Sequence, residues 1–289
     1  MENKIILVTG ATAGIGAESV KQLAKKGAHV VLVGRNEGKC QRIISEVQRE
    51  TSHNKLDYLV ADLSSMAAVR QLASDFKARY DRLDVLLNNA GAMFLKYEES
   101  PDGLEMTFAL NHINYFLLTH ELLGLLQQTK GARVVNVASD AHRPGKINLS
   151  DLQMKQGYSG WGQYCNSKLM NIMFTYAAHR RLQGSGVSIN CLHPGFVASD
   201  FGDNNASGTI GKLFVGVWRF AKKLSAISVE KGASTQVYLA ASPEVEGISG
   251  RYFSKRKAIK SIPLSYDETL GEALWTETEA ITGVRWPVR

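Results

Sequence analysis

The chain is most constrained by a glycine-rich segment, TGATAGIG at positions 9–16, that lies between two regular patterns. The apolar run IILV at 5–8 precedes it and reads as a buried strand, whereas a helical pattern follows it. In such a unit, Gly10 permits the tight turn, Gly14 lets the backbone approach a pyrophosphate, and Gly16 allows close helix–strand packing. The phosphates would lie on free N–H groups at the start of the helix. No GK[ST] sequence follows, so the loop is not a P-loop, and a merely structural glycine turn is the alternative.

Strand-like and helical patterns alternate along the rest of the chain. Apolar runs such as VVLV at 30–33 and VVNV at 134–137 are continuous, which indicates burial on both faces. Strands that alternate with helices predict right-handed βαβ units. We therefore expect one α/β domain over 1–289, with a doubly wound parallel sheet of about seven strands and helices on both faces. The predicted strands are 4–9, 29–34, 56–61, 83–88, 132–138, 187–192 and 251–254, and the predicted helices are 14–26, 36–51, 64–80, 104–128, 164–183 and 230–241.

Two long segments interrupt this alternation, at 140–163 and 194–228. Structureless loops longer than about 12–15 residues are usually functional or disordered. The second segment contains LFVGVWRFAKKL at 213–224, where aromatic and basic side chains recur at helical spacing. Three interpretations stay open for this stretch: a helix that caps the core, a substrate lid, or a helix on a membrane surface. We expect a substrate-binding lid at about 194–228 within the single domain.

The net charge of +7, from 34 Lys and Arg against 27 Asp and Glu, suits an anionic partner. Nucleic acid is not expected, because the basic residues are spread along the chain and no recognition motif is present. No secretory signal and no run of roughly 18–20 apolar residues is present, so we expect no transmembrane anchor, while peripheral membrane contact stays open. Cys40, Cys165 and Cys191 have no CxxC spacing, which argues against disulfides and zinc and for a cytoplasmic location.

The residue after the second predicted strand indicates the type of dinucleotide. NAD sites usually place Asp or Glu there, whereas an arginine accommodates a 2′-phosphate. Here Gly34 is followed by Arg35 and Asn36, with Lys39 one helical turn on. An arginine binds phosphate through a planar fork of donors. We therefore expect NADP(H) rather than NAD(H), with a solvated arginine as the structural alternative.

Four further side chains form a candidate catalytic set. Tyr164 and Lys168 are four residues apart in a helical pattern, so they share one face of the predicted helix. Ser139 follows the fifth predicted strand, and Asn111 belongs to the preceding predicted helix. In an open parallel sheet, the ligand crevice lies at the carboxyl ends of the strands. The set is therefore expected at that edge.

The ordered motifs resemble those of the short-chain dehydrogenases/reductases over about residues 4–255, which implies a Rossmann-type fold. The gap between Ser139 and Tyr164 is longer than is usual in that superfamily. Its sequence HRPGKINLSDL at 142–152, with RLQGSG at 181–186, is similar to the retinol dehydrogenase-like branch. That branch commonly prefers NADP and reduces lipid-derived or other apolar aldehydes and ketones. The motifs are TGxxxGIG at 9–16, DL at 62–63, NNAG at 88–91, Asn111, Ser139, YCNSK at 164–168 and PG at 194–195.

The resemblance implies a catalytic role for each of the four side chains. Tyr164 would be the general acid in reduction and the base in oxidation. Lys168 would lower the pKa of Tyr164, ordinarily about 10, and bind the nicotinamide ribose. Ser139 would donate a hydrogen bond to the substrate oxygen, and Asn111 would hold a water in a proton relay to Lys168.

The resemblance also implies the cofactor contacts. Asp62 and Leu63 would contact the adenine, and Asn89 the ribose region. Ser199 stands where the family often has threonine and would bond the nicotinamide carboxamide. The expected cofactor-binding residues are Gly10, Thr12, Ala13, Gly14, Ile15, Gly16, Arg35, Asn36, Asp62, Leu63, Asn89, Ala90, Gly91, Tyr164, Lys168, Pro194, Gly195, Val197 and Ser199.

Other conspicuous side chains are expected to lie outside the chemistry. His112 and His193 are isolated histidines without a metal-ligand cluster, so they are expected to be structural. Cys165 adjoins Tyr164 but should point away from the reaction centre, because successive helical residues are about 100° apart. Trp161 is expected to line the substrate entrance.

The sequence therefore predicts an NADPH-dependent oxidoreductase that interconverts an apolar aldehyde or ketone and its alcohol by hydride transfer. One alternative is a catalytically silent NADP(H)-binding regulatory or scaffold protein. The other is an enzyme that reduces an activated C=C bond on the same scaffold. Members of the resembling family often associate through the helices that hold Asn111 and Tyr164, so a homodimer or homotetramer is also left open.

Overall fold

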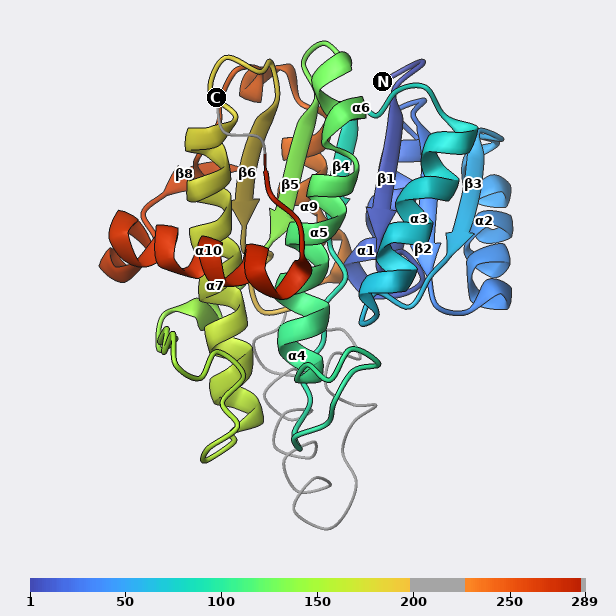
Figure 1. The fold of residues 1–289 in the computed structure, drawn as a ribbon. Coiled ribbons are helices and arrows are strands. Elements are labelled where there is room, and N and C mark those ends of the chain that lie inside the picture. The colour runs from blue at the N-terminus through green and yellow to red at the C-terminus, as the bar shows by residue number, and fades with distance from the viewer. Residues whose placement is uncertain (198–226, 287–289) are drawn as a thin grey trace.

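The computed structural model describes residues 1–197 and 227–286, and its strands form one eight-stranded sheet (Figure 1). The strand order is β3-β2-β1-β4-β5-β6-β7-β8, and only the β7–β8 pair is antiparallel. The predicted α/β fold with a doubly wound parallel sheet is confirmed, and β8 extends it at one edge. The strands are β1 (Ile5–Thr9), β2 (His29–Gly34), β3 (Leu56–Val60), β4 (Val85–Asn88), β5 (Arg133–Val137), β6 (Ser188–Leu192), β7 (Tyr252–Ser254) and β8 (Lys257–Ile259).

Helices cover both faces of the sheet. The helices α1, α2 and α9 lie on one face, and α3, α5, α6 and α7 lie on the other, with α10 outside α5 and α7 (Figure 1). The helices are α1 (Gly14–Ala24), α2 (Glu37–Thr51), α3 (Met66–Arg79), α4 (Met106–Phe108), α5 (Asn114–Glu121), α6 (Leu123–Gln128), α7 (Gly160–Arg181), α9 (Val229–Ala241) and α10 (Glu268–Thr282).

The continuous apolar strands supply a hydrophobic core on each face. In β1, Ile6 and Val8 belong to the core under α1 and α9, whereas Leu7 belongs to the core under α3 and α5. Successive strand residues point to opposite faces, so both sets must be apolar when helices cover both sides. This is why the strand patterns are continuous rather than alternating.

The structure differs from the predicted elements in three places. The predicted helix at 104–128 is divided into α4, a π-helix (Ala109–Ile113), α5 and α6. The helix α7 begins at Gly160 rather than at 164, because Ser159 caps it by accepting a hydrogen bond from the Gly162 N–H (3.2 Å). Finally, β8 and α10 lie beyond the last predicted element.

The helix α10 covers the outer face of α5 and α7. Its Trp275 contacts Phe116 of α5 and Phe174 of α7, with ring centroids 4.9 and 5.8 Å apart. The Arg181 guanidinium lies 3.9 Å from the centre of the Trp275 ring, and it also pairs with Glu272 of α10. A segment of the same chain thus covers the outer face of the helices for which association with a second copy was left open.

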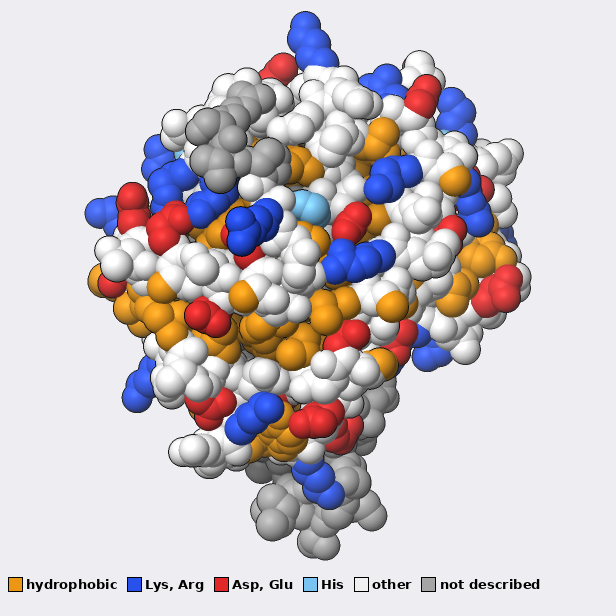
Figure 2. Space-filling view, in the orientation of Figure 1, with side chains coloured by type: hydrophobic (Ala, Val, Ile, Leu, Met, Phe, Trp, Pro, Cys, Tyr) orange, Lys and Arg blue, Asp and Glu red, His pale blue; other side chains and the backbone are white. Residues whose placement is uncertain are grey.

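The face that carries α10 is shown as a surface in Figure 2. Hydrophobic side chains form a band across its middle, in the region that α10 crosses, and Lys and Arg are scattered among Asp and Glu rather than gathered in one patch. Within residues 1–197 and 227–286, no helix combines the length and apolarity that a membrane span requires.

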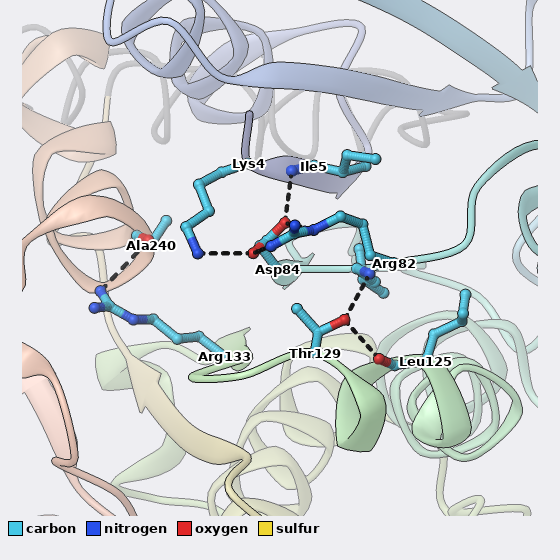
Figure 3. A network of polar contacts seen from close by, with 9 residues as sticks. Lys4, Ile5, Arg82, Asp84, Leu125, Thr129, Arg133 and Ala240 are labelled. Carbon is cyan, nitrogen blue, oxygen red and sulfur yellow. Dashed lines mark hydrogen bonds and ion pairs between the residues drawn. The ribbon is translucent and has the colours of Figure 1, made fainter. Parts of the chain in front are cut away.

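The amino ends of β1 and β4 are joined by a charged network (Figure 3). Asp84 accepts hydrogen bonds from Lys4 Nζ and the Ile5 N–H, both at 2.9 Å, and from Arg82 Nη2 at 2.6 Å. Burial opposes ionisation of this carboxyl, but the three donors hold its pKa below the usual range. The loops that follow the strands emerge at the opposite edge.

Candidate active site

The candidate site lies at the carboxyl ends of β1, β4 and β5, which are neighbours in the sheet. These ends lie at the lower edge of the sheet in Figure 1. The glycine loop follows β1, the NNAG segment at 88–91 closes β4, and Ser139 follows β5. The strand order therefore brings three separate motifs together, as expected for a doubly wound sheet.

The glycine loop has the backbone that the sequence predicts. Gly10 has a φ of +63°, and a Cβ on it would lie 2.8 Å from Ala90 Cα. A Cβ on Gly16 would lie 2.2 Å from the Gly10 carbonyl oxygen, so only glycine lets α1 start this close to β1. Ala13, the residue before α1, offers no side-chain cap, so the first N–H groups of α1 are open to another acceptor. These features fit the pyrophosphate of a dinucleotide.

The NNAG segment is bonded to the glycine loop through Asn89 and Thr9. The Asn89 amide donates to the carbonyl oxygens of Thr9 (2.8 Å) and Gly10 (3.2 Å). In return, the Thr9 hydroxyl accepts from the N–H groups of Asn89 (2.9 Å) and Ala90 (3.0 Å). The Asn89 amide nitrogen thus has a structural role in holding the protein backbone. From the sequence, only a contact with the ribose region was expected for Asn89.

Arg35 is exposed directly after β2, beside the glycine loop. A Cβ on Gly34 would lie 2.5 Å from Thr12 Cγ2, so the end of β2 and the loop are in close contact. Asn36 caps α2 by accepting from the Lys39 N–H (2.9 Å), which gives its side chain a structural use. Within the described ranges, neither Arg35 nor Lys39 forms an ion pair, so both cations are available to a phosphate.

Asp62 and Leu63, expected at the adenine, follow β3. Asp62 accepts hydrogen bonds from the Ser64 N–H (3.0 Å) and hydroxyl (2.8 Å). The Leu63 side chain is 5% exposed and belongs to the hydrophobic core. Leu63 can therefore reach an adenine only through its backbone, whereas the Asp62 carboxylate lies at the surface.

Asn111 lies in the π-helix and is fully buried. Its amide accepts from the Ala92 N–H (2.9 Å) and donates to the Ala92 carbonyl (3.0 Å) and to the Ser167 hydroxyl (2.9 Å). It therefore joins the segment after β4 to α7. A Cβ on Gly91 would lie 3.1 Å from Asn111 Oδ1 and 3.2 Å from Lys168 Nζ, so glycine keeps the space before these groups open.

Ser139, Tyr164 and Lys168 meet beside that space. The Ser139 hydroxyl hydrogen-bonds Tyr164 and also accepts from the Ala141 N–H (3.2 Å). Lys168 Nζ donates to the Val137 carbonyl at the end of β5 (3.0 Å) and lies 5.7 Å from the centre of the Tyr164 ring. Of the predicted catalytic set, these three thus form one cluster, and Asn111 borders it.

Burial dominates the protonation of this cluster. It raises the pKa of Tyr164 to about 12, although the bond from Ser139 opposes the shift. Burial also lowers the pKa of Lys168 to about 7. At pH 7 only about half of Lys168 is protonated, so without bound coenzyme the expected lowering of the Tyr164 pKa by Lys168 does not outweigh the effect of burial.

Three further polar or aromatic residues support the candidate site, although no role was predicted for them from the sequence. Thr9 joins the two cofactor loops, and Ser167 holds Asn111. The Tyr115 ring lies 5.7 Å from Lys168 Nζ, and its hydroxyl donates to the Val137 carbonyl (3.3 Å). Thr9 belongs to the TGxxxGIG motif and Ser167 to the YCNSK motif, so the motifs mark the positions of both residues. Tyr115 belongs to none of the motifs, so the sequence does not mark it.

The segment after β6 approaches the same edge. Gly195 has a φ of +88°, and Val197 pairs with Ile227 in a short parallel bridge. A Cβ on Gly232 of α9 would lie 2.7 Å from Val197 and 2.9 Å from Ile15, so this segment lies against the start of α1. Ser199, the aromatic and basic stretch at 213–224 and most of the expected lid lie outside the described residues.

The side chains expected outside the chemistry have structural contacts. His112 is buried and bonds Thr278 of α10 (2.9 Å), and burial lowers its pKa to about 3. His193 Nδ1 accepts from the Gly195 N–H (3.2 Å). All three cysteines are buried free thiols. In the described part of the chain, no three His, Cys, Asp or Glu side chains are arranged to hold a metal ion.

Known proteins match the chain over nearly its whole length. The family model described as short chain dehydrogenase matches residues 4–209. Polyprenol dehydrogenase from Homo sapiens is 37% identical over 292 residues, covering 98% of this chain and 86% of that protein. Retinol dehydrogenase 12 from Bos taurus is 37% identical over 283 residues, covering 98% of this chain and 87% of that protein.

Solved structures show the same architecture. A protein from Mycobacterium paratuberculosis superimposes with a TM-score of 0.79 at 29% identity, over 99% of this chain and 96% of that one. A protein from Escherichia coli CFT073, complexed with NADPH, superimposes with a TM-score of 0.69 at 25% identity, over 89% of this chain and 98% of that one. Together with the sequence relatives, these matches show that the chain belongs to the short-chain dehydrogenase family of oxidoreductases that act on CH–OH groups and is related to the retinol and polyprenol dehydrogenases.

Proposed function

We propose that the protein is an NADP(H)-dependent oxidoreductase that interconverts an apolar aldehyde or ketone and its alcohol. The cluster of Ser139, Tyr164 and Lys168 beside the glycine loop carries this proposal. Polyprenol and retinol dehydrogenases, named for apolar alcohols, are among its relatives, which supports an apolar substrate. Tyr164 is the proton donor in reduction and the acceptor in oxidation.

The residues of the chain divide the chemistry among themselves. When bound, the nicotinamide supplies or accepts the hydride. The Ser139 hydroxyl, which already faces Tyr164, can donate to a substrate oxygen held between the two side chains and stabilise charge there. Tyr164 then transfers its proton to that oxygen. Protonated Lys168 stabilises the resulting phenolate and binds the ribose hydroxyls.

Arg35 supports NADP(H) as the coenzyme. Its exposed guanidinium, with Lys39 nearby, offers donors for a 2′-phosphate at the adenosine end. The glycine loop would hold the pyrophosphate and Lys168 the nicotinamide ribose. Structural relatives in complex with NADPH or NADP are consistent with this assignment.

A comparison of coenzymes tests both parts of the proposal. NADPH oxidation is followed at 340 nm with a panel of apolar aldehydes and ketones, beside NADH, in the wild type and in Arg35→Ala. We expect NADPH to be preferred and the variant to lose at least about tenfold in kcat/KM with NADPH, since a charge-assisted bidentate bond is removed. The NADH value should change by less than about twofold. Equal losses with both coenzymes would contradict the role of Arg35.

The proposal also covers the location and the domain organisation of the chain. We propose a cytoplasmic location, supported by the free thiols of Cys40, Cys165 and Cys191. We also propose a single domain over 1–289, supported by the one continuous sheet. Cell fractionation tests the first proposal and limited proteolysis the second.

A further inference from the structure

One tryptophan is exposed beside the candidate proton donor. Trp161 is 43% exposed, whereas Trp275 and Trp286 are buried, with 4% and 3% exposed. The Trp161 ring centroid lies 6.0 Å from that of Tyr164, and the ring planes are 33° apart. A large indole face therefore lies next to the ring of Tyr164, in a position where it contributes little to the core.

The order of side chains along α7 shows which part of a substrate would meet this indole. Trp161, Tyr164 and Lys168 are spaced by three and four residues, so they share one face of the helix. With Lys168 at the nicotinamide ribose and Tyr164 at the substrate oxygen, Trp161 lies one turn further from the cofactor. It therefore faces the group attached to the carbonyl carbon.

The first turn of α7 holds Trp161 in place. A Cβ on Gly160 would lie 2.3 Å from the Phe94 carbonyl oxygen, so this turn rests directly on the neighbouring backbone. The Tyr158 hydroxyl lies 2.8 Å from the same Phe94 oxygen, and Ser159 caps the helix. The indole is thus carried by a rigid element, as a preorganised binding surface requires.

We propose that Trp161 determines substrate preference by stacking on a planar, conjugated group next to the carbonyl. A flat π-system can lie offset on the indole face, whereas a saturated group gains only contact area. The inference rests on the proposed carbonyl reduction and names its substrate class: aryl or polyunsaturated carbonyl compounds are preferred to saturated ones of equal size.

The kinetic test uses benzaldehyde and cyclohexanecarbaldehyde, which have the same carbon skeleton size. Trp161→Leu keeps apolar bulk but removes the aromatic face, and Trp161→Phe restores an aromatic face. We expect the ratio of kcat/KM values, benzaldehyde over cyclohexanecarbaldehyde, to fall about 3- to 10-fold in Trp161→Leu through KM. In Trp161→Phe the ratio should stay within about twofold of the wild type. An unchanged ratio in Trp161→Leu overturns the inference.

Tyr266→Leu is the matched control, because Tyr266 is also an exposed aromatic residue (49%) and is stacked on Tyr176 instead. Its ratio should equal that of the wild type. If Tyr266→Leu lowers the ratio as much as Trp161→Leu does, the effect is not specific to Trp161 and the inference is overturned.

A binding experiment separates this inference from the proposed function. Benzaldehyde is titrated into the NADP⁺ complex, and tryptophan emission is compared between the wild type and Trp161→Phe. Saturable quenching in the wild type that is lost in the variant supports the inference, even if neither aldehyde is reduced and the proposed reduction fails. Equal quenching in both proteins overturns it.

Discussion

Burial shifts the proton affinities of Tyr164 and Lys168 in opposite directions. The phenol of Tyr164 has a pKa of about 12, and the ammonium of Lys168 has a pKa of about 7. Both shifts favour the neutral form, because the site is poorly solvated. At neutral pH, Tyr164 therefore holds the proton that reduction requires, and Lys168 is close to half protonated.

The Lys168 shift predicts a pH-dependent contribution to stability. Its pKa is about 7 in the folded chain and about 10.4 in an unfolded one, so between these values the unfolded chain binds the extra proton. The free energy of unfolding of the wild type, relative to Lys168→Met, should therefore fall as the pH is lowered from about 10 to 7, by at most ~1.4 kcal/mol per pH unit. Urea unfolding of the wild type and Lys168→Met without coenzyme measures this difference at each pH. Free energies of unfolding that change with pH in parallel in the two proteins would contradict the pKa shift of Lys168.

Single residues also show how far a motif determines the use of a side chain. The motifs predict that Ser139, Tyr164 and Lys168 lie at one edge of the sheet, and in the structure these three side chains are neighbours. They do not predict that the side-chain amide groups of Asn89 and Asn36 form hydrogen bonds with the protein backbone. A motif fixes where a residue stands along the chain, but hydrogen-bond partners depend on which loops meet in the fold.

At the scale of elements, the π-helix is joined to the C-terminal helix. Asn111 and His112 are adjacent in the π-helix, and His112 Nε2 bonds the Thr278 hydroxyl of α10 (2.9 Å). The other ring nitrogen of His112 is buried and has no partner among the described residues. The bond to Thr278 is therefore the polar contact that holds this turn, and with it Asn111, against α10.

Removing that contact should affect both stability and activity. Thr278→Val leaves a buried imidazole nitrogen unpaired, so we expect a loss of about 1–3 kcal/mol in the free energy of unfolding. We also expect a several-fold lower kcat with an unchanged KM for NADPH, since Asn111 would be less well held. Thr276→Val is the control, because Thr276 is exposed on the same helix. Equal unfolding curves for the two variants would refute the anchoring role.

Of the elements that were not predicted, β8 and the π-helix have no distinct sequence pattern, whereas α10 has one. The three residues of β8 are all exposed, so no periodicity marks this edge strand. A π-helix adds one residue to a turn, and the sequence pattern around Asn111 is still helical. The helix α10 did carry signals: Asp267 caps its start, and Gly283 adopts the left-handed conformation after its end.

At the scale of the whole molecule, α10 covers the catalytic helices. Trp275 lies against Phe116 and Phe174, and Trp286 completes the aromatic cluster, 5.0 Å from Trp275. Helix α5 follows the π-helix that contains Asn111, and α7 contains Tyr164 and Lys168. By packing on both helices, α10 therefore also supports the site from outside. The parallel sheet and its ligand edge were predictable from strand patterns, whereas this cover depends on packing between distant segments.

The cover predicts a large difference between two tryptophans. Trp275→Ala should lower the free energy of unfolding by about 3–5 kcal/mol, because a buried aromatic side chain is replaced by a cavity. Trp161→Ala should change it by less than about 0.5 kcal/mol, since that side chain is exposed. Urea unfolding of both variants measures the contrast. A small effect of Trp275→Ala would mean that α10 adds little to the fold.

The central claim, that Tyr164 is the proton donor of an NADPH-dependent carbonyl reductase, is tested most directly by Tyr164→Phe. NADPH oxidation is measured with the best carbonyl substrate of the wild type, and the NADPH dissociation constant is measured by cofactor fluorescence. We expect kcat to fall about 10²- to 10⁴-fold, with the dissociation constant unchanged within about threefold. Tyr238→Phe, whose hydroxyl bonds Glu244 (3.0 Å) away from the site, should retain full activity. Full activity in Tyr164→Phe would contradict the account.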